Sequence, residues 1–155
     1  MAADIVKRTT VMVRDAEAAA RWYEAVFGMT RAMDTPFTLS GRQLAAGARG
    51  DRTRLVIMQG RDADLGAIGL LQWIDPPMDA PAEPAGRIAF GQPIFVVAAA
   101  DCRATVERAR AAGSRIHCEP VEWSVTGFDG REQRMLGASF FDPDGYFFEA
   151  NERLG

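Results

Sequence analysis

One carboxylate, Glu149, is the side chain of this sequence best placed for chemistry, because of the segment that leads into it. That segment, Phe140 to Glu149, reads FFDPDGYFFE. Its Asp-Pro-Asp-Gly core is a turn sequence: proline presets φ at a turn corner, aspartate accepts local backbone hydrogen bonds, and glycine tolerates the left-handed conformation. Aromatic-rich strands on both sides predict a tight hairpin. Strand alternation puts Glu149 with Phe147 on one face, where a lone carboxylate is costly, so we expect it to be functional.

The run His117-Cys118-Glu119 also contains residue types that occur in catalytic sites. Adjacent residues of a strand point to opposite faces, so His117 and Cys118 cannot share one proton or one metal ion. We therefore do not expect nucleophilic catalysis there. The sequence contains no glycine-rich phosphate-binding motif and no nucleophile elbow.

Two tryptophans, Trp73 and Trp123, lie where a ligand or a partner chain could reach them. Trp73 immediately precedes a proline-rich segment, and Trp123 lies in the polar stretch 119–133. Aromatic residues in loops often contact flat ligands or partners. We expect 119–133 to be a loop and a candidate lid, with Gly127 and Gly130 as its flexible points.

The elements that must position these residues occur twice. Each half has an apolar strand, then a helix with an aspartate N-cap, an amphipathic stripe and a terminating glycine. The strands are 10–13 and 94–97, and the helices run from Asp15 to Gly28 and from Asp101 to Gly113. Three strand candidates follow each helix, at 36–39, 54–59 and 68–74, then at 115–118, 135–141 and 146–151. Each half therefore reads β-α-β-β-β, and four prolines between the halves predict a linker.

Composition excludes several classes of protein. With 155 residues, 48% hydrophobic and 25% charged, the chain is typical of a globular domain. A net charge of -3 with scattered basic residues argues against a nucleic-acid partner. The sequence shows neither a bilayer-spanning apolar run nor a signal-peptide pattern, and its two cysteines form no disulfide framework. We therefore expect a cytoplasmic protein without a membrane partner.

The repeated order, with VRDAEAAARWYEAVFGM early and FFDPDGYFFEANE late, resembles the vicinal oxygen chelate superfamily of glyoxalases, bleomycin-resistance proteins and extradiol dioxygenases. The resemblance covers nearly the whole chain. It implies an α+β fold in which two βαβββ modules form a cupped mixed sheet with helices on the outer face. It also implies one domain over 1–155, with module one at about 5–75, a proline-rich linker at about 76–91 and module two at about 92–152. A homodimer is the family expectation.

The family often binds a divalent metal in the cup, through His or Gln, Glu, His and Glu on its first, fourth, fifth and eighth strands. The matching positions here are Arg8, Gln72, Ile94 (or Gln92 if the strand slips by two) and Glu149. Arginine is a permanent cation without a lone pair to donate, so we expect no metal cofactor. If a metal does bind, Glu149 and Gln72 are its candidate ligands. We expect Arg8 and Glu149 instead to pair inside the cavity.

The expected function is binding of a small organic molecule in the cup, with Glu149 as the candidate catalytic residue. The expected ligand-binding side chains are Arg8, Thr10, Met12, Leu70, Gln72, Gln92, Ile94, Trp123, Phe147 and Glu149. One alternative is a metal-dependent lyase, isomerase or dioxygenase of the same superfamily. Another is a metal-free acid–base enzyme, with the pKa of Glu149 tuned by burial and by Arg8. A plain interaction domain without a pocket is the third.

Overall fold

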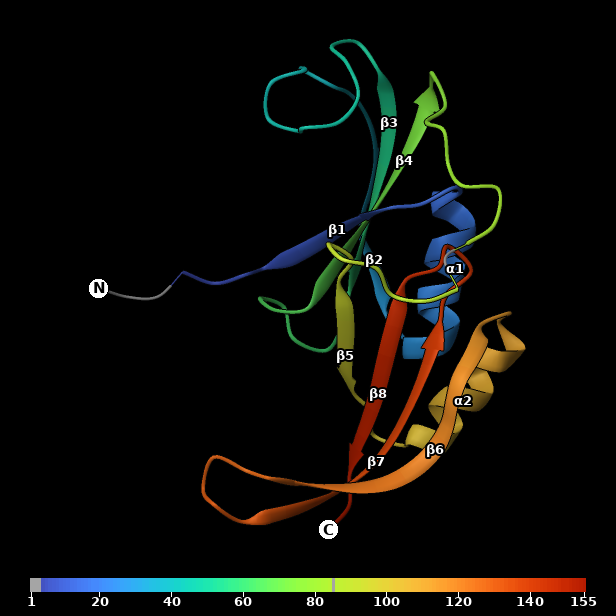
Figure 1. Cartoon of the computed structure of the whole chain (residues 1–155). Coiled ribbons are helices and arrows are strands. Elements are labelled where there is room, and N and C mark those ends of the chain that lie inside the picture. Colours follow the sequence, from blue (N-terminus) through green and yellow to red (C-terminus); the bar gives the residue numbers. More distant parts are fainter. Residues whose placement is uncertain (1–3, 85) are drawn as a thin grey trace. The chain divides into compact units, whose positions relative to one another are not determined.

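The structure is a computed structural model that describes residues 4–84 and 86–155 (Figure 1). The chain divides between Ala82 and Glu83, inside the predicted linker, into two compact units. The elements of the first unit are β1 (Arg8–Met12), α1 (Ala16–Phe27), β2 (Thr30–Thr38), β3 (Arg52–Gln59) and β4 (Ala67–Asp75). Those of the second unit are β5 (Ile94–Ala98), α2 (Cys102–Ala111), β6 (Arg115–Thr126), β7 (Glu132–Phe141) and β8 (Phe147–Arg153). The predicted α+β class and the repeated β-α-β-β-β order are confirmed.

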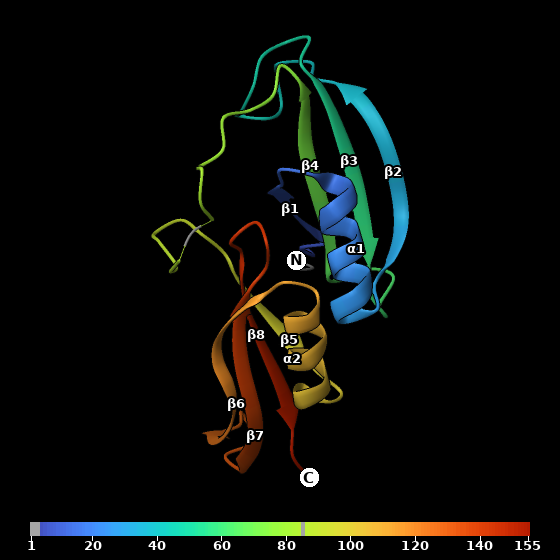
Figure 2. The same ribbon diagram turned by 90° about the vertical axis from the view of Figure 1, so that its right-hand side faces the viewer.

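In the first unit a mixed four-stranded sheet, ordered β1-β4-β3-β2, is covered on one face by α1 (Figure 2). Strand β1 pairs with β4 in parallel, and the other two pairs are antiparallel. Helix α1 begins where the Asp15 carboxylate accepts hydrogen bonds from the amides of Glu17 and Ala18. It ends at Gly28, whose φ of 65° is left-handed. Its buried stripe packs on β3 and β4, where Val56, Met58 and Leu70 are 0% exposed.

The second unit repeats this plan, with the sheet order β5-β8-β7-β6 and α2 packed on β6, β7 and β8 (Figure 2). Asp101 caps the helix by accepting from the Ala104 amide. The helix ends at Ala111 with Ala112 as its C-cap, so the predicted end at Gly113, which has a φ of 87°, is two residues too late. Strands β1 and β5 each lie at the edge of their own sheet, and each pairs in parallel with the last strand of its unit.

The predicted hairpin around Asp-Pro-Asp-Gly is confirmed between β7 and β8. The Gly145 amide donates to the Asp142 carbonyl, and the Asp142 carboxylate accepts from the amides of Asp144 and Tyr146. Gly145 has a φ of 93°, a conformation that favours glycine. The register puts Phe147 opposite Phe141, and Glu149 opposite Ser139.

Two predicted strand boundaries are also wrong. Strand β2 begins at Thr30, six residues before the predicted start, and carries Pro36, which its edge position tolerates. The stretch 119–133 is not a loop: β6 continues to Thr126 and β7 begins at Glu132, so only a short turn with Gly127 and Gly130 connects them. Val121, Trp123 and Val125 alternate with polar residues, which is the pattern of a strand with one face in water.

Among the described residues, neither helix is long and apolar enough to cross a membrane.

Candidate functional site

The register of the first sheet decides which predicted site residues share a face. Arg8, Thr10 and Met12 of β1 alternate with Val11, which is buried under α1. Across the sheet Thr10 pairs with Gly69 and Met12 with Leu71, so these residues share the open face, away from the helix. Leu70 pairs with Val11 on the helix face and is 0% exposed. The prediction that Leu70 lines the cup is therefore wrong by one residue, because alternation gives that role to Leu71.

Gln72 also faces the helix, which overturns its predicted place in the cup and as a metal ligand. Its Oε1 accepts a hydrogen bond of 3.0 Å from the amide of Ala16, the first residue of α1. The same arrangement recurs in the second unit, where Glu152 Oε2 accepts from the Cys102 amide at 2.8 Å. The repeat therefore aligns Gln72 with Glu152, and aligns Glu149, three residues earlier, with Gly69. The side chains of Gln72 and Glu152 each accept a hydrogen bond from an amide that the start of a helix leaves unpaired.

A pocket of about 490 Å³ lies on the open face of the first sheet. The sheet contributes Arg8, Thr10, Leu55 and Leu71, and the end of β2 with the segment that follows it contributes the rest. Those remaining lining residues are Phe37, Thr38, Leu39, Ser40, Gly41, Gln43, Leu44 and Ala46. Met12 lies on the same face outside the pocket and is partly exposed.

Arg8 forms the cationic end of the pocket, and Thr10 and Gly69 lie next to its side chain. Arg8 Nε donates to Thr10 Oγ1 at 3.1 Å. Both side chains lie over Gly69, where an added Cβ would be 2.6 Å from Thr10 Oγ1 and 3.3 Å from Arg8 Cδ. Glycine at this position leaves the space that the pair occupies. Because Nε is engaged, the two terminal nitrogens of the guanidinium are the donors that can face the pocket.

The segment between β2 and β3 forms the opposite wall, and sequence reasoning missed it. Leu39 packs with Leu71 and Trp73 in a small apolar cluster. The Asp51 carboxylate fastens the segment by accepting from Trp73 Nε1 at 3.2 Å and from the Ala48 amide at 2.8 Å. Trp73 is 7% exposed, so the expectation that it contacts a ligand or a partner is wrong. The glycines of SGRQLAAGARGD were the available signal, since this segment needs tight local bends.

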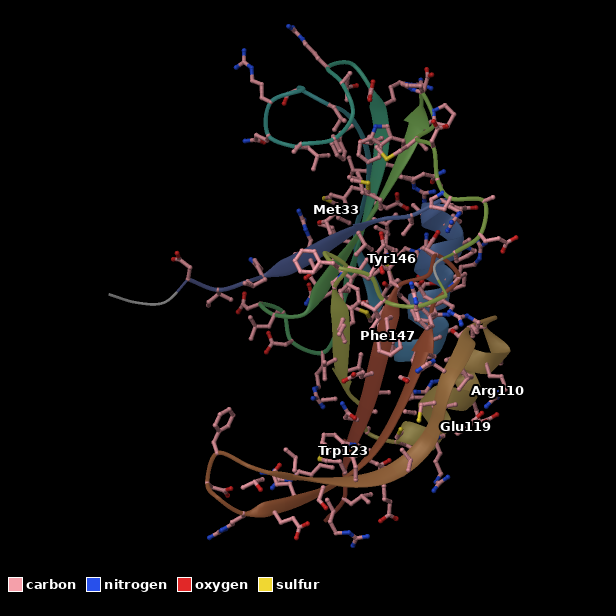
Figure 3. The ribbon with its side chains drawn as sticks, in the orientation of Figure 1. Met33, Arg110, Glu119, Trp123, Tyr146 and Phe147 are labelled. Carbon is pink, nitrogen blue, oxygen red and sulfur yellow. The ribbon has the colours of Figure 1, made fainter. Side chains whose placement is uncertain are left out.

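The remaining candidates lie in the second unit, where Phe147 and Glu149 are on the face of the sheet opposite α2. Figure 3 labels Phe147 and Trp123. Phe147 is packed between the rings of Phe141 and His117, at centroid distances of 4.9 and 5.9 Å. Glu149 is half-buried beside Val96 and Ser139, as alternation predicted.

Three further candidates have different environments. Trp123 belongs to β6, is 42% exposed, and has its indole over Gly137, where an added Cβ would lie 2.6 Å from Nε1. Ile94 begins β5 and is exposed. Gln92 precedes the strand, and its Oε1 accepts from the Ala89 amide. Arg8 and Glu149 belong to different units, and their pairing stays a prediction.

The residues present do not fit a divalent metal. Within the described part of either unit, no three His, Cys, Asp or Glu side chains gather as metal ligands. At the positions that match the family's ligands, Arg8 is a cation, and Gly69, which the helix contacts align with Glu149, has no side chain. Gln72, the predicted match, accepts from a helix amide instead. Glu149 is the one matched carboxylate of the set. A single carboxylate is a poor site for metals that require three or more protein ligands.

Two carboxyl groups have strongly shifted pKa values, and neither lines the pocket. Hydrogen bonds from Arg31 and Arg54 lower the pKa of Glu17 on α1 to about 2. Burial raises the pKa of Asp142, in the turn before β8, to about 7, against the opposing effect of backbone amides. The Glu17 network ties α1 to β2 and β3 through contacts of 2.8 and 2.9 Å.

Comparisons with known proteins agree on one family. The family model that matches is described as Glyoxalase/Bleomycin resistance protein/Dioxygenase superfamily, and it matches residues 5–150. The comparison with curated proteins found no match.

Several solved structures are similar to this chain. One is a glyoxalase family protein from Bacillus cereus, with 17% identity and a TM-score of 0.78 over 100% of this chain and 99% of that one. Another is a glyoxylase/bleomycin resistance protein/dioxygenase domain from Frankia sp. EAN1pec, with 20% identity and a TM-score of 0.62 over 99% and 100%. TioX from Micromonospora sp. ML1 has 17% identity and a TM-score of 0.55 over 95% and 97%. Likeness at these identities concerns the fold.

Proposed function

Because the chain belongs to the glyoxalase/bleomycin resistance protein/dioxygenase superfamily, we propose that it binds a small organic molecule in the pocket of its first unit, without a metal ion. The observation that carries the proposal is the pocket itself. Its volume of about 490 Å³ falls in the range of small-molecule sites. A domain that serves only as a flat interaction surface would have no such cavity.

The character of the lining also supports binding. Leu55, Leu71 and Leu44 give the pocket apolar walls, while Arg8 and Thr10 give it one polar end. Apolar walls supply most of the affinity for a small ligand, and a few fixed polar groups set its orientation. The segment that forms the second wall is fastened by Asp51 and by the Leu39–Trp73 packing, so part of the site is formed before a ligand arrives.

The test is ligand binding by two matched variants. Leu44 lines the pocket and is 42% exposed, whereas Leu65 lies in the same unit outside the pocket and is 47% exposed. Leu44→Asp puts a charge in the apolar wall and should abolish the thermal shift that small aromatic molecules cause in the parent protein. Leu65→Asp should leave that shift unchanged. Equal shifts in both variants would place binding elsewhere and refute the proposal.

A second candidate function is acid–base catalysis by Glu149, favoured by its half-buried place on the open face of the second sheet. Glu149→Gln should then remove turnover of a bound molecule while its affinity is retained. Glu132→Gln, on an exposed strand end, is the matched control. A parent protein that binds without turning its ligand over leaves only the binding function.

We also propose that the protein is a cytoplasmic homodimer. Within its own sheet β5 is an edge strand, and it exposes Ile94 and Val96. Such an edge favours association with a second chain. Light scattering at micromolar concentration should give twice the mass of the 155-residue chain, and a monomeric mass would reject the dimer.

A further inference from the structure

We infer that the molecule bound in the first-unit pocket is a monocarboxylate with an apolar body, and that Arg8 binds its carboxylate. The inference rests on the proposed function and adds the chemical class of the ligand. It is carried by the charges at the pocket and by the geometry of Arg8.

Among the described residues that line the pocket, Arg8 is the only charged side chain. Its hydrogen bond within the described part of the first unit goes to a neutral hydroxyl, that of Thr10. Two carboxylates of this unit, Glu17 and Asp34, already accept hydrogen bonds from other arginines. Their donors are Arg31 and Arg54 on the helix face. Arg8 is exposed. An anionic ligand that reaches its guanidinium gains a charge-assisted hydrogen bond that a neutral ligand cannot offer.

The geometry favours a carboxylate among anions. Thr10 occupies Nε, so the remaining donors of Arg8 are on its two terminal nitrogens. That pair of nitrogens matches the two oxygens of a carboxylate in a bidentate contact. Because the hydrogen bond to Thr10 already orients Nε, Arg8 loses less freedom when a ligand binds.

The rest of the pocket limits the ligand to one charge. Beyond Arg8 the sheet presents Leu55, Leu71 and, at the end of β2, Phe37, and the facing segment presents Leu44. The polar lining there consists of neutral groups, the hydroxyls of Thr38 and Ser40 and the amide of Gln43. A second ionised group on the ligand would meet these surfaces without a cation, at a large desolvation cost. An aromatic or branched aliphatic body fills the same space favourably.

The experiment compares acids with their own primary amides, which have nearly the same shape and no charge. The probes are benzoate with benzamide, 2-naphthoate with 2-naphthamide, and octanoate with octanamide, titrated by NMR at pH 7 into the full chain. The wild type is compared with Arg8→Gln and with Arg61→Gln, an exposed arginine of the same unit outside the pocket. Arg8→Lys keeps the charge and removes the planar fork.

In the wild type we expect at least one acid to bind about 10- to 100-fold more tightly than its amide. The preference should disappear in Arg8→Gln, weaken in Arg8→Lys and persist in Arg61→Gln. Equal affinity for acid and amide, unaffected by Arg8→Gln, would overturn the inference and leave the proposed function standing. Probes that perturb no pocket resonance at millimolar concentration would overturn both. A preference that emerges only in Glu149→Gln would show that Glu149 already pairs with Arg8, and this too would overturn the inference.

Discussion

Replacing Gly69 by alanine should weaken acid binding without weakening the fold. The new Cβ would lie 2.6 Å from Thr10 Oγ1, well inside van der Waals contact, so the Thr10 side chain must rotate. Rotation breaks its 3.1 Å bond with Arg8 Nε and frees the guanidinium. A freed arginine must be ordered again when a ligand binds, which costs about 0.5–1.5 kcal/mol and weakens binding about two- to tenfold.

The stability of Gly69→Ala should change little. Alanine in a strand gains about 0.5–1 kcal/mol over glycine, because glycine loses more conformational entropy on folding. The lost Arg8–Thr10 bond is at the surface and costs a similar amount, about 0.5–1.5 kcal/mol. The two effects offset each other, so the melting temperature measured by circular dichroism should move by no more than about 2–4 °C.

The assay is a titration of 2-naphthoate and 2-naphthamide into Gly69→Ala, with Gly60→Ala as control. An added Cβ at Gly60 meets only Met29 Cε, at 4.0 Å, so this control should bind as the wild type does. In a Thr10→Ala background the clash is gone, and Gly69→Ala should have no further effect on acid affinity. An affinity for the acid that Gly69→Ala leaves unchanged would refute the positioning of Arg8 by Thr10. So would an equal loss of affinity for the acid and for the amide.

Two further predictions concern the helix face of the first unit. Gln72→Ala should lower the free energy of unfolding by about 1 kcal/mol, as loss of a cap does, while ligand affinity stays unchanged; reduced affinity at unchanged stability would contradict the capping role. The pKa of Glu17 is lowered from 4.5 to about 2 in the folded protein by Arg31 and Arg54, so its stabilisation is complete above pH 4.5 and is lost as the pH falls toward 2. Glu17→Gln should therefore flatten the dependence of unfolding free energy on pH in that window, and an unchanged profile in urea titrations would contradict the network.

Strong local signals predicted most of the elements. Asp15 and Gly28 bound the first helix because capping depends on short-range hydrogen bonds and on one left-handed residue. Asp-Pro-Asp-Gly fixed the last hairpin for the same reason. Strand β2 was found only in part, because its length depends on pairing with β3, and the sequence of an edge strand says little about its partner.

The site was less predictable than the fold, because a shift of one residue in a strand exchanges its faces. Matching the run Leu70-Leu71-Gln72 to Phe147-Phe148-Glu149 puts Gln72 at the position of Glu149. The hydrogen bonds to the helix starts instead align Gln72 with Glu152. Arg8 and Thr10 share a strand face by alternation, and both line the pocket, while their part in ligand binding stays a prediction. The pocket wall formed by the segment after β2 follows from long-range contacts of Leu39 and Asp51, which no local pattern reveals.

The most direct measurement of the binding claim is a set of intermolecular NOEs between 2-naphthoate and methyl-labelled protein. We expect cross-peaks from the naphthalene protons to the methyl groups of Leu71, Leu44 and Thr10, which line the pocket. We expect none from Leu70, which faces α1. Cross-peaks confined to methyl groups outside the pocket, such as those of Leu65, would contradict binding in the pocket.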